Sequence, residues 1–359
     1  MADVAKLAEQ YNRNKRRKFL YITFFFIALI IVAIVSVSFG AGSPRLGTVF
    51  TVLRAKLFPF LDLYPGSATE QIIVFTLRLP RIILAIIAGA GLAASGAVMQ
   101  GILRNPLTSP YVLGISSAAA FGASLSIVFG IGIITSVSGQ YVVVINAFIF
   151  SLVSMLFVYS IGRLGGMRTE TIILAGVAVG YLFSALVSLI QYIAPSYEAL
   201  KGVVYWLMGG LSFASWSNIS IVLAVVAITT VLMMFQSWNI NVMSMGEDVA
   251  KSTGVNSSRV LSLNIVLVTL QTATIISFTG VIGFVCLIAP HLSRMLVGSD
   301  HRFLIPCSAI IGAFILLASD TVARLVISPN ELPVGILTSL LGVPFFIYML
   351  TRRKRQMWN

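Results

Sequence analysis

Long apolar runs that are almost free of charge constrain this chain more than any other feature of its sequence. Residues 82–103, 111–133, 141–162 and 171–193 contain no acidic residue and no histidine. A helix needs about 20 apolar residues to cross the ~30 Å hydrocarbon core of a bilayer, and each run is long enough. Hydrophobic residues make up 58% of the 359 residues and charged residues only 10%, which is too little polar surface for a water-soluble protein. We therefore expect an all-α polytopic membrane protein, and not a soluble enzyme, a disordered scaffold or a disulfide-rich secreted domain.

Ten runs are expected to span the membrane. The stretch 260–297 is nearly uninterrupted and would be almost twice too long as one helix, so we expect it to turn back at Thr279-Gly280. The first run is longer than the core of a signal peptide and is interpreted as a retained helix. The predicted permease domain covers 19–351, between a basic N-terminal segment, 1–18, and a basic tail, 352–359. Its spans are 19–39, 82–103, 111–133, 141–162, 171–193, 218–238, 260–278, 280–297, 303–320 and 334–351.

Basic residues test this topology, because cytoplasmic segments of membrane proteins carry an excess of Lys and Arg. The chain has 24 Lys and Arg against 11 Asp and Glu, a net charge of +13. With both termini in the cytoplasm, 17 basic residues are cytoplasmic and seven are outside. Nine form two terminal clusters beside apolar spans, which is typical of contact with anionic lipid and not of nucleic-acid binding. The seven outer residues are Arg45, Arg54, Lys56, Arg78, Arg81, Lys201 and Arg324.

The sequence lacks the groups that energise other classes of transporter. The first long spans carry no buried acid or histidine that could relay a proton, and the chain has no GxxxxGK[ST] loop to hold ATP phosphates. Cys286 and Cys307 lie in apolar runs and fit neither a disulfide framework nor a zinc site. Asp320, at the end of a span, is as readily a structural partner of Arg324 as a functional group. The chain is therefore expected to be a translocation pathway whose energy comes from another protein.

Small residues form a stripe along the second span. Ala85, Gly89, Ala93, Ala97 and Gly101 recur every four residues and so lie on one face of a helix. Small residues let helices approach closely in lipid, where no hydrophobic effect drives their association. We interpret the stripe as a helix-packing surface and not as a contact for a transported substrate.

Three ordered groups of motifs carry a family resemblance. The first contains LRLPR at 77–81, GAVMQG at 96–101 and NPL at 105–107; the second contains LAGVA at 174–178 and YWLMGG at 205–210. The third, within 280–344, contains GF, APH, DHR, DTVAR, ELPVG and GVPF. Together they resemble the permease subunits of binding-protein-dependent ABC importers for iron–siderophore, haem and cobalamin, the FecCD-type permeases. The resemblance extends over nearly the whole chain from about residue 70.

The resemblance implies partners and a coupling loop. In this family two ten-helix permeases, identical or related, pair around a pathway, two ABC ATPase subunits dock from the cytoplasm, and a substrate-binding protein docks outside. The loop that contacts the ATPases corresponds to 239–259, where Glu247 and Asp248 favour the start of a short helix and Gly254 its end. The candidate ATPase-coupling residues are Met245, Gly246, Glu247, Asp248, Ala250 and Gly254.

The same resemblance assigns residues at both ends of the pathway. Arg78, Arg81 and Arg324 match arginines that pair with glutamates of the binding protein, whereas Arg45, Arg54 and Lys56 receive only a general electrostatic role. Thr169 and Glu170 match the cytoplasmic gate. Glu170 departs from the small hydroxyl residue of the family pattern, and capping the fifth span would be an equally natural role for it.

These observations predict a multi-pass transport subunit in a prokaryotic cytoplasmic membrane, working by alternating access and catalysing no covalent chemistry. The favoured cargo is a ferric siderophore, with haem or cobalamin as alternatives. No cofactor or metal is expected on this chain, because ATP and Mg²⁺ belong to the ATPase. An ion-coupled secondary transporter and a membrane-embedded enzyme are the other classes considered. The nearest candidate for an enzymatic site, His291 beside Arg294, is expected simply to end a span at the cytoplasmic surface.

Overall fold

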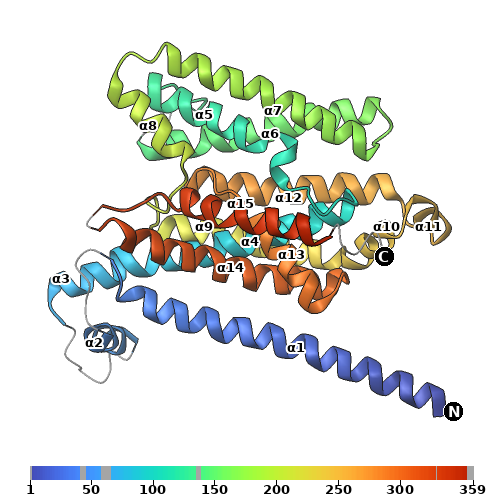
Figure 1. The fold of residues 1–359 in the computed structure, drawn as a ribbon. Helices are drawn as coiled ribbons and strands as arrows, with labels where there is room; N and C mark the ends of the chain where they lie inside the picture. Colours follow the sequence, from blue (N-terminus) through green and yellow to red (C-terminus); the bar gives the residue numbers. More distant parts are fainter. Residues whose placement is uncertain (1, 41–45, 58–65, 135–138, 329, 354–359) are drawn as a thin grey trace.

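The computed structural model describes residues 2–40, 46–57, 66–134, 139–328 and 330–353 (Figure 1). All regular elements within these ranges are helical, and no strand occurs in them. Seven helices are long and apolar enough to cross a membrane, and three shorter apolar helices accompany them. The predicted all-α membrane architecture is therefore confirmed, while the number of helices that cross a bilayer stays a prediction.

The ten longer helices follow the predicted spans in order. They are α1 (Ala2–Val37), α4 (Leu79–Ile102), α5 (Ile115–Phe129), α6 (Gln140–Leu164), α7 (Thr169–Tyr192), α9 (Trp216–Phe235), α12 (Ser257–Thr279), α13 (Val285–Val297), α14 (His301–Val326) and α15 (Val334–Arg353). The shorter elements are α2 (Leu46–Leu57), α3 (Ala68–Gln71), the π-helix η2 (Ile72–Arg78), the 3-10 helix η3 (Pro110–Leu113), α8 (Tyr197–Leu207), α10 (Ser237–Ser244) and α11 (Glu247–Ser252). The predicted turn at Thr279-Gly280 separates α12 from α13.

Two predicted spans are shorter in the structure than in the sequence pattern. The run 111–133 begins with η3, and α5 starts only after Gly114, whose positive φ of 72° breaks the helix. The run 280–297 is helical only over α13, because Gly280 and Phe284 both have positive φ. Hydropathy records only apolar character, so it cannot register such breaks within an apolar run. At the N-terminus the reverse holds, since α1 continues through the segment predicted as a separate basic extension.

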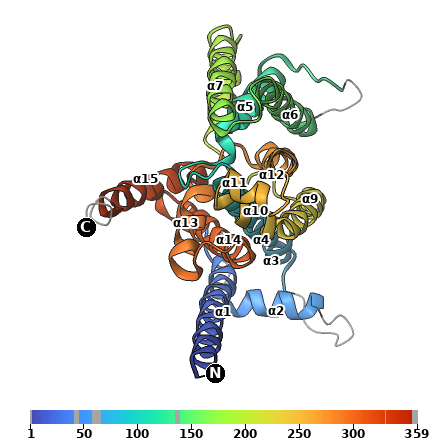
Figure 2. The same cartoon turned by 90° about the vertical axis from the view of Figure 1, so that its right-hand side faces the viewer.

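The two ends of the molecule carry different elements. α1 begins and α15 ends toward the end that holds α10 and α11, whereas α2 and α3 lie at the opposite end (Figures 1 and 2). We refer to these as the α11 end and the α3 end. The even alternation of the longer helices between them is the arrangement that the span count predicts.

Helix α4 occupies the middle of the bundle because its small residues let neighbours approach its backbone. A Cβ on Gly89 would lie 2.4 Å from the carbonyl oxygen of Gly312 in α14, and one on Gly96 would lie 1.9 Å from that of Cys286 in α13. A Cβ on Gly101 would lie 2.4 Å from Nε2 of His301. The small-residue stripe is therefore a packing surface, as its spacing predicts.

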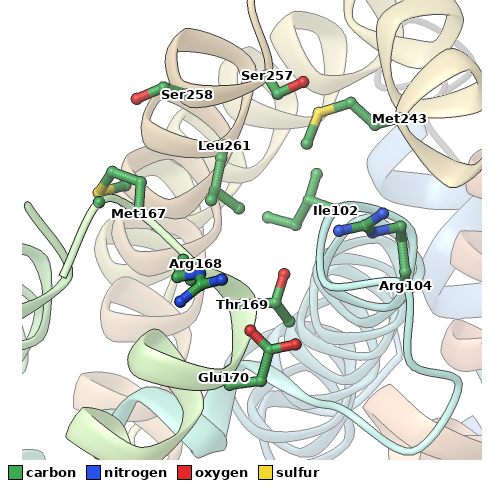
Figure 3. Close-up of a pocket in the computed structure, with 11 residues that line it drawn as sticks. Ile102, Arg104, Met167, Arg168, Thr169, Glu170, Met243, Ser257, Ser258 and Leu261 are labelled. Atoms are coloured by element: carbon green, nitrogen blue, oxygen red, sulfur yellow. The ribbon is translucent and has the colours of Figure 1, made fainter. Parts of the chain in front are cut away.

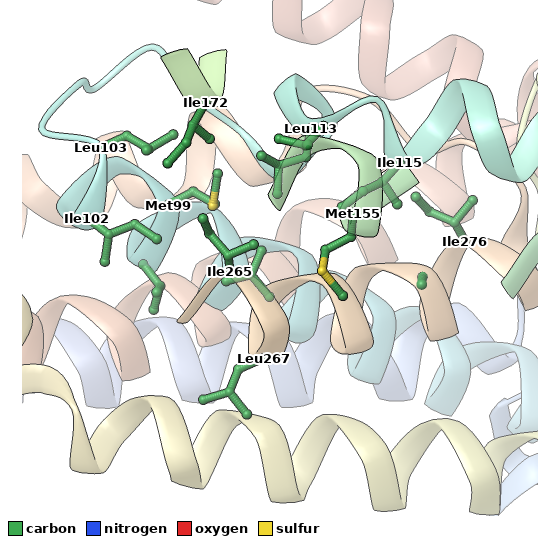
Figure 4. Close-up of a cluster of buried hydrophobic side chains, with 14 of the residues drawn as sticks. Met99, Ile102, Leu103, Leu113, Ile115, Met155, Ile172, Ile265, Leu267 and Ile276 are labelled. Carbon is green, nitrogen blue, oxygen red and sulfur yellow. The ribbon is translucent and has the colours of Figure 1, made fainter. Parts of the chain in front are cut away.

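Helices α5, α6 and α7 form a separate layer on one side of α4 and α12, with α1 on the opposite side (Figures 1 and 2). A cluster of buried side chains joins this layer to the central helices, with Met99 from α4, Ile115 from α5, Met155 from α6 and Ile265 from α12 (Figure 4). Apolar contacts hold the layer in place, so the two parts meet at a packed surface.

One buried glutamine side chain, Gln271, links three helices of the bundle. Gln271 in α12 donates to the backbone oxygen of Gly91 in α4 at 2.6 Å and accepts from the hydroxyl of Thr229 in α9 at 2.5 Å. In an apolar surrounding an unpaired amide would be costly, so this link favours one mutual register of the three helices.

Candidate functional site

The short helix α11 lies at the α11 end in the predicted coupling loop. Gly246, with φ of 124°, precedes it, and Gly254, with φ of 77°, follows its last turn. The main-chain N–H of Val255 donates to the oxygen of Ala250 at 2.8 Å, which closes the helix end. The predicted helix start at Glu247 and its end before Gly254 are thus confirmed, while contact with an ATPase stays a prediction.

Helix α11 presents two different faces. Ala250 is fully buried, so the helix is seated on the rest of the chain, whereas Asp248 and Lys251 are exposed. The neighbouring Met245 is 72% exposed, so a large apolar side chain lies beside these charges. Apolar side chains beside exposed charges are typical of a surface that meets another protein.

An asparagine that the sequence analysis did not single out connects this region to α14. Oδ1 of Asn241 in α10 accepts from the main-chain N–H of His301 at 2.8 Å and lies 2.8 Å from Nδ1 of the same histidine. Nδ2 of Asn241 donates to Asp300 at 2.8 Å. Asp300 is the N-cap of α14, and an aspartate before an apolar run is the signal that predicts such a cap.

The Asp300 carboxylate is held in its charged form. Burial opposes its ionisation, but hydrogen bonds from Arg302 and Asn241 outweigh that effect and lower the pKa of Asp300 to about 2. It therefore stays an anion at neutral pH and ties the start of α14 to α10.

A cavity of about 520 Å³ opens at the α11 end between the ends of α4, α7 and α12 (Figure 3). Thr169 and Glu170, predicted as gate residues, both line it, together with Arg104 and Arg168, which the sequence analysis counted only as cytoplasmic charges. The full lining is Ile102, Arg104, Gly166, Met167, Arg168, Thr169, Glu170, Met243, Ser257, Ser258 and Leu261. The gating role of Thr169 and Glu170 stays a prediction.

The backbone around this cavity is strained. Arg104 and Met167 have positive φ of 51° and 57°, and they are two of the three non-glycine residues with positive φ in the described part of the chain. Such conformations cost roughly 1–3 kcal/mol each and gather where a structure changes shape or binds a ligand. Strained backbone and converging charges therefore mark this cavity as a candidate for the inner end of a pathway.

At the α3 end, charged side chains from distant segments meet in one cluster. Asp320 in α14 pairs with Arg81 in α4 at 2.9 Å and with Arg324 at 3.0 Å, and Arg81 also pairs with Glu331. The side chains of Asp320 and Arg324 are fully buried, and Arg81 is 15% exposed. The salt bridge between Asp320 and Arg324 weighed from the sequence is therefore confirmed.

The three arginines predicted to dock a binding protein differ in exposure. Arg324 donates to the backbone oxygens of Phe39 at 2.9 Å and Ser36 at 3.3 Å, so its guanidinium is engaged inside the chain. Arg78 is 6% exposed and packs against Gly40, where a Cβ would lie 2.1 Å from its Nη1. Arg81 is the member that reaches the rim of the cluster. Docking stays a prediction for all three.

Three more of the basic residues predicted to lie outside come from the segment before α3. Arg54 and Lys56 lie at the end of α2, and Lys56 stands 6.0 Å above the ring of Phe75. Arg45 lies outside the described residues.

The residues that the sequence analysis considered for an enzymatic, disulfide or metal site were Arg294 and the two cysteines, among others. Arg294 in α13 donates to Gln100 in α4 at 3.1 Å, and both cysteines are buried as free thiols. In the ranges that the structure describes, no three His, Cys, Asp or Glu side chains come together to hold a metal ion.

A comparison with models of protein families identifies the family of this chain. The sequence model of the FecCD transport family matches residues 28–352. The chain belongs to the FecCD transport family. The motif resemblance from which the coupling loop and the gate were assigned is thereby confirmed as a family relationship, with α11 and the cavity beside it inside the matched range.

Relatives with similar sequences match more than nine tenths of the chain. An ABC transporter permease of Methanocaldococcus jannaschii is 39% identical over 352 residues, which cover 96% of this chain and 98% of the relative. The permease of a molybdate import system from Haemophilus influenzae is 38% identical and covers 92% and 94% of the two chains. The permease of an iron(3+)-hydroxamate import system from Bacillus subtilis is 37% identical, and the match covers 91% of this chain and 82% of the relative.

A solved structure shares the fold of this FecCD-family chain. It is an inward-facing metal-chelate type ABC transporter, with a TM-score of 0.80 and 34% sequence identity, covering 92% of this chain and 98% of the other. Family members of this kind are transport permeases of membranes and not enzymes, in agreement with the expected class of this chain.

Proposed function

We propose that this chain is the membrane-spanning subunit of an ATP-driven importer for a metal chelate, in a prokaryotic cytoplasmic membrane. It has ten spans, with both termini and the α11 end in the cytoplasm. The observation that carries the proposal is α11, a short capped helix with exposed charges between α10 and α12 of a FecCD-family chain. A separate ATPase can contact a short surface helix at this place and displace it.

Two ATPase subunits would drive a pair of permeases, either two copies of this chain or this chain and a related one. ATP binding closes the ATPases and displaces α11. Because α10 directly precedes α11 in the chain and Asn241 links α10 to the start of α14, the displacement also reaches α14. Thr169, Glu170 and the strained turns at Arg104 and Met167 then open or close the inner cavity. The permease moves the cargo without covalent chemistry or a cofactor of its own.

The extracytoplasmic binding protein would dock at the α3 end. Arg81 is already paired with Glu331, whose side chain is 36% exposed. A carboxylate of the binding protein could replace Glu331 at Arg81, while Arg78 and the buried Arg324 hold the cluster together. Arg54 and Lys56 add positive charge nearby and would attract an acidic partner.

A ferric siderophore is the favoured cargo, with haem or cobalamin as alternatives. An iron(3+)-hydroxamate relative at 37% identity supports a siderophore, while the molybdate relative at 38% shows that related chains are associated with different cargo. Overall similarity therefore does not rank these substrates. An ion-coupled secondary transporter is the less favoured class, because the early spans carry no acidic residue or histidine to relay a proton.

Co-purification from native membranes tests the ATPase partnership. The tagged wild-type chain is compared with a coupling variant, Asp248→Lys plus Gly254→Pro. The matched control is Glu198→Lys plus Gly130→Pro, since Gly130 also ends a helix with positive φ of 66° and Glu198 is exposed. We expect an ATPase to accompany the wild type and the control and to be lost from the coupling variant.

Two results would contradict the proposal. One is a wild-type chain without any ATPase while the permease pair is intact, and the other is a coupling variant that keeps it. Uptake that survives vanadate but is abolished by an uncoupler would favour the secondary transporter.

A further inference from the structure

A second cavity, of about 380 Å³, lies at the α11 end between the start of α1 and the turn that joins α13 to α14. It is separate from the gate cavity and shares none of its lining residues. Its lining is Lys15, Arg17, Lys18, Met295, Leu296, Val297, Gly298, Asp300, Arg302 and Phe303.

The charge of this cavity is strongly positive. Four of the described residues that line it are cationic and one, Asp300, is anionic. Asp300 is already held by Arg302 at 2.7 Å and by Asn241 at 2.8 Å. The positive charge contributed by α1, from Lys15, Arg17 and Lys18, therefore faces the cavity without a carboxylate of the lining to neutralise it. Such a site attracts an anion with several oxygen acceptors.

The walls of the cavity are held by aromatic contacts. The ring of Phe303 in α14 packs edge-on against Phe19 in α1, with centroids 6.0 Å apart, and Nζ of Lys18 lies 4.8 Å above the same ring. Gly298, with φ of 81°, makes the tight turn on the other side. Because these contacts fix α1 against α14, the cations are gathered before any ligand binds.

The position of the cavity points to lipid. The apolar span of α1 begins at Lys15, so the cations lie where hydrocarbon would give way to headgroups. Beside them Leu20 and Phe24 are 62% and 65% exposed, and Met295 is 69% exposed. A soluble phosphate would use only the cations, whereas a phospholipid would also cover these exposed apolar side chains with its acyl chains.

We propose that this cavity binds the phosphate headgroup of an anionic phospholipid at the membrane boundary, between α1 and α14. Lys15, Arg17 and Lys18 bind the phosphate oxygens, and Met295 and Phe24 contact the acyl chains. The site is independent of which cargo the chain carries.

Native mass spectrometry of the full chain in non-ionic detergent tests this site, with phosphatidylglycerol and phosphatidylcholine as probes. The cavity variant is Lys15→Gln plus Lys18→Gln. The matched control is Arg16→Gln plus Arg259→Gln, which removes two exposed cations outside the cavity. We expect phosphatidylglycerol to bind the cavity variant about 30-fold more weakly than the wild type, since each cation near a membrane surface contributes roughly fivefold. The control should stay close to the wild type.

Three outcomes would overturn the proposal. Equal loss of phosphatidylglycerol from both variants would show only general attraction of charge. Equal affinity of the wild type for phosphatidylcholine would remove the anionic selectivity. Displacement of the lipid by millimolar inorganic phosphate would assign the cavity to a soluble anion. No uptake is measured, so a failed transport function and a failed lipid site give different results.

Discussion

At the scale of single residues, the charged cluster at the α3 end links segments far apart in the sequence. Arg81 and Glu331 are 250 positions apart, and Arg324 reaches back to Ser36 and Phe39. A buried charge is tolerable only when its partners remain, because the interior cannot replace the lost hydration. Asp320 is the centre of this cluster, since both Arg81 and Arg324 pair with it.

Asp320→Asn should destabilise the protein strongly. The substitution leaves the fully buried Arg324 without its carboxylate, and breaking a buried pair in this way costs roughly 3–5 kcal/mol. Thermal unfolding of the purified chain in detergent measures the effect. Glu331→Gln is the control, and because Glu331 is 36% exposed we expect a loss of under about 1 kcal/mol. Equal losses for the two variants would refute the central role of Asp320.

At the scale of helices, α10 is more than a connection between α9 and α12. Its Asn241 satisfies three polar groups at the start of α14, from Asp300 and His301. The same histidine packs against Gly101 at the end of α4. Movement of α10 would therefore be transmitted to α14 and α4, and not only to the helices adjoining it in sequence.

Asn241→Ala should weaken the link between ATP hydrolysis and transport. The substitution removes the oxygen that pairs with the main-chain N–H and Nδ1 of the buried His301, at a cost of about 1–3 kcal/mol. In proteoliposomes that contain the complete importer, we expect less uptake per ATP hydrolysed. Asn239→Ala is the matched control, because its amide donates only to Gln236 nearby in the chain. Unchanged coupling in Asn241→Ala would show that α10 does not transmit the movement in this way.

At the scale of the whole molecule, the alternating direction of the longer helices gives the two ends different features. The α11 end holds α11, the cavity lined by Thr169 and Glu170, and the basic start of α1, while the α3 end holds the arginine cluster (Figure 1). This separation is what an importer needs if one partner docks outside and another inside.

Thiol labelling should place the two ends on opposite sides of the membrane. Glu198→Cys in α8 and Ser252→Cys in α11 put an exposed thiol at each end, and the native Cys286 and Cys307 are buried. A membrane-impermeant maleimide applied to intact cells, or to spheroplasts if an outer membrane is present, should label only Glu198→Cys, and in inverted vesicles only Ser252→Cys. Labelling of both from one side would refute the ten-span topology.

The linear pattern of residues was enough to predict the helical membrane class, the order of the helices, the turn at Thr279-Gly280 and the limits of α11. These properties depend on the hydropathy and backbone preferences of neighbouring residues, which a linear pattern records. Through motifs of a family that is now established, it also predicted a gate at Thr169 and Glu170 and the ATPase-coupling residues, and these roles stay predictions.

Contacts between polar groups far apart in the chain could not be predicted from the sequence and depend on how the helices pack. The pair between Arg81 and Glu331, the pair between Asn241 and His301, and the basic cavity between α1 and α14 all join segments far apart in the chain, and so do the contacts around the buried Arg324. The break before α5 was equally invisible, because it lies within an apolar run. Each span must be apolar to lie in lipid, and this requirement can be recognised within that span alone. A buried charge is stable only beside a partner, and that partner comes from another part of the chain once the helices pack.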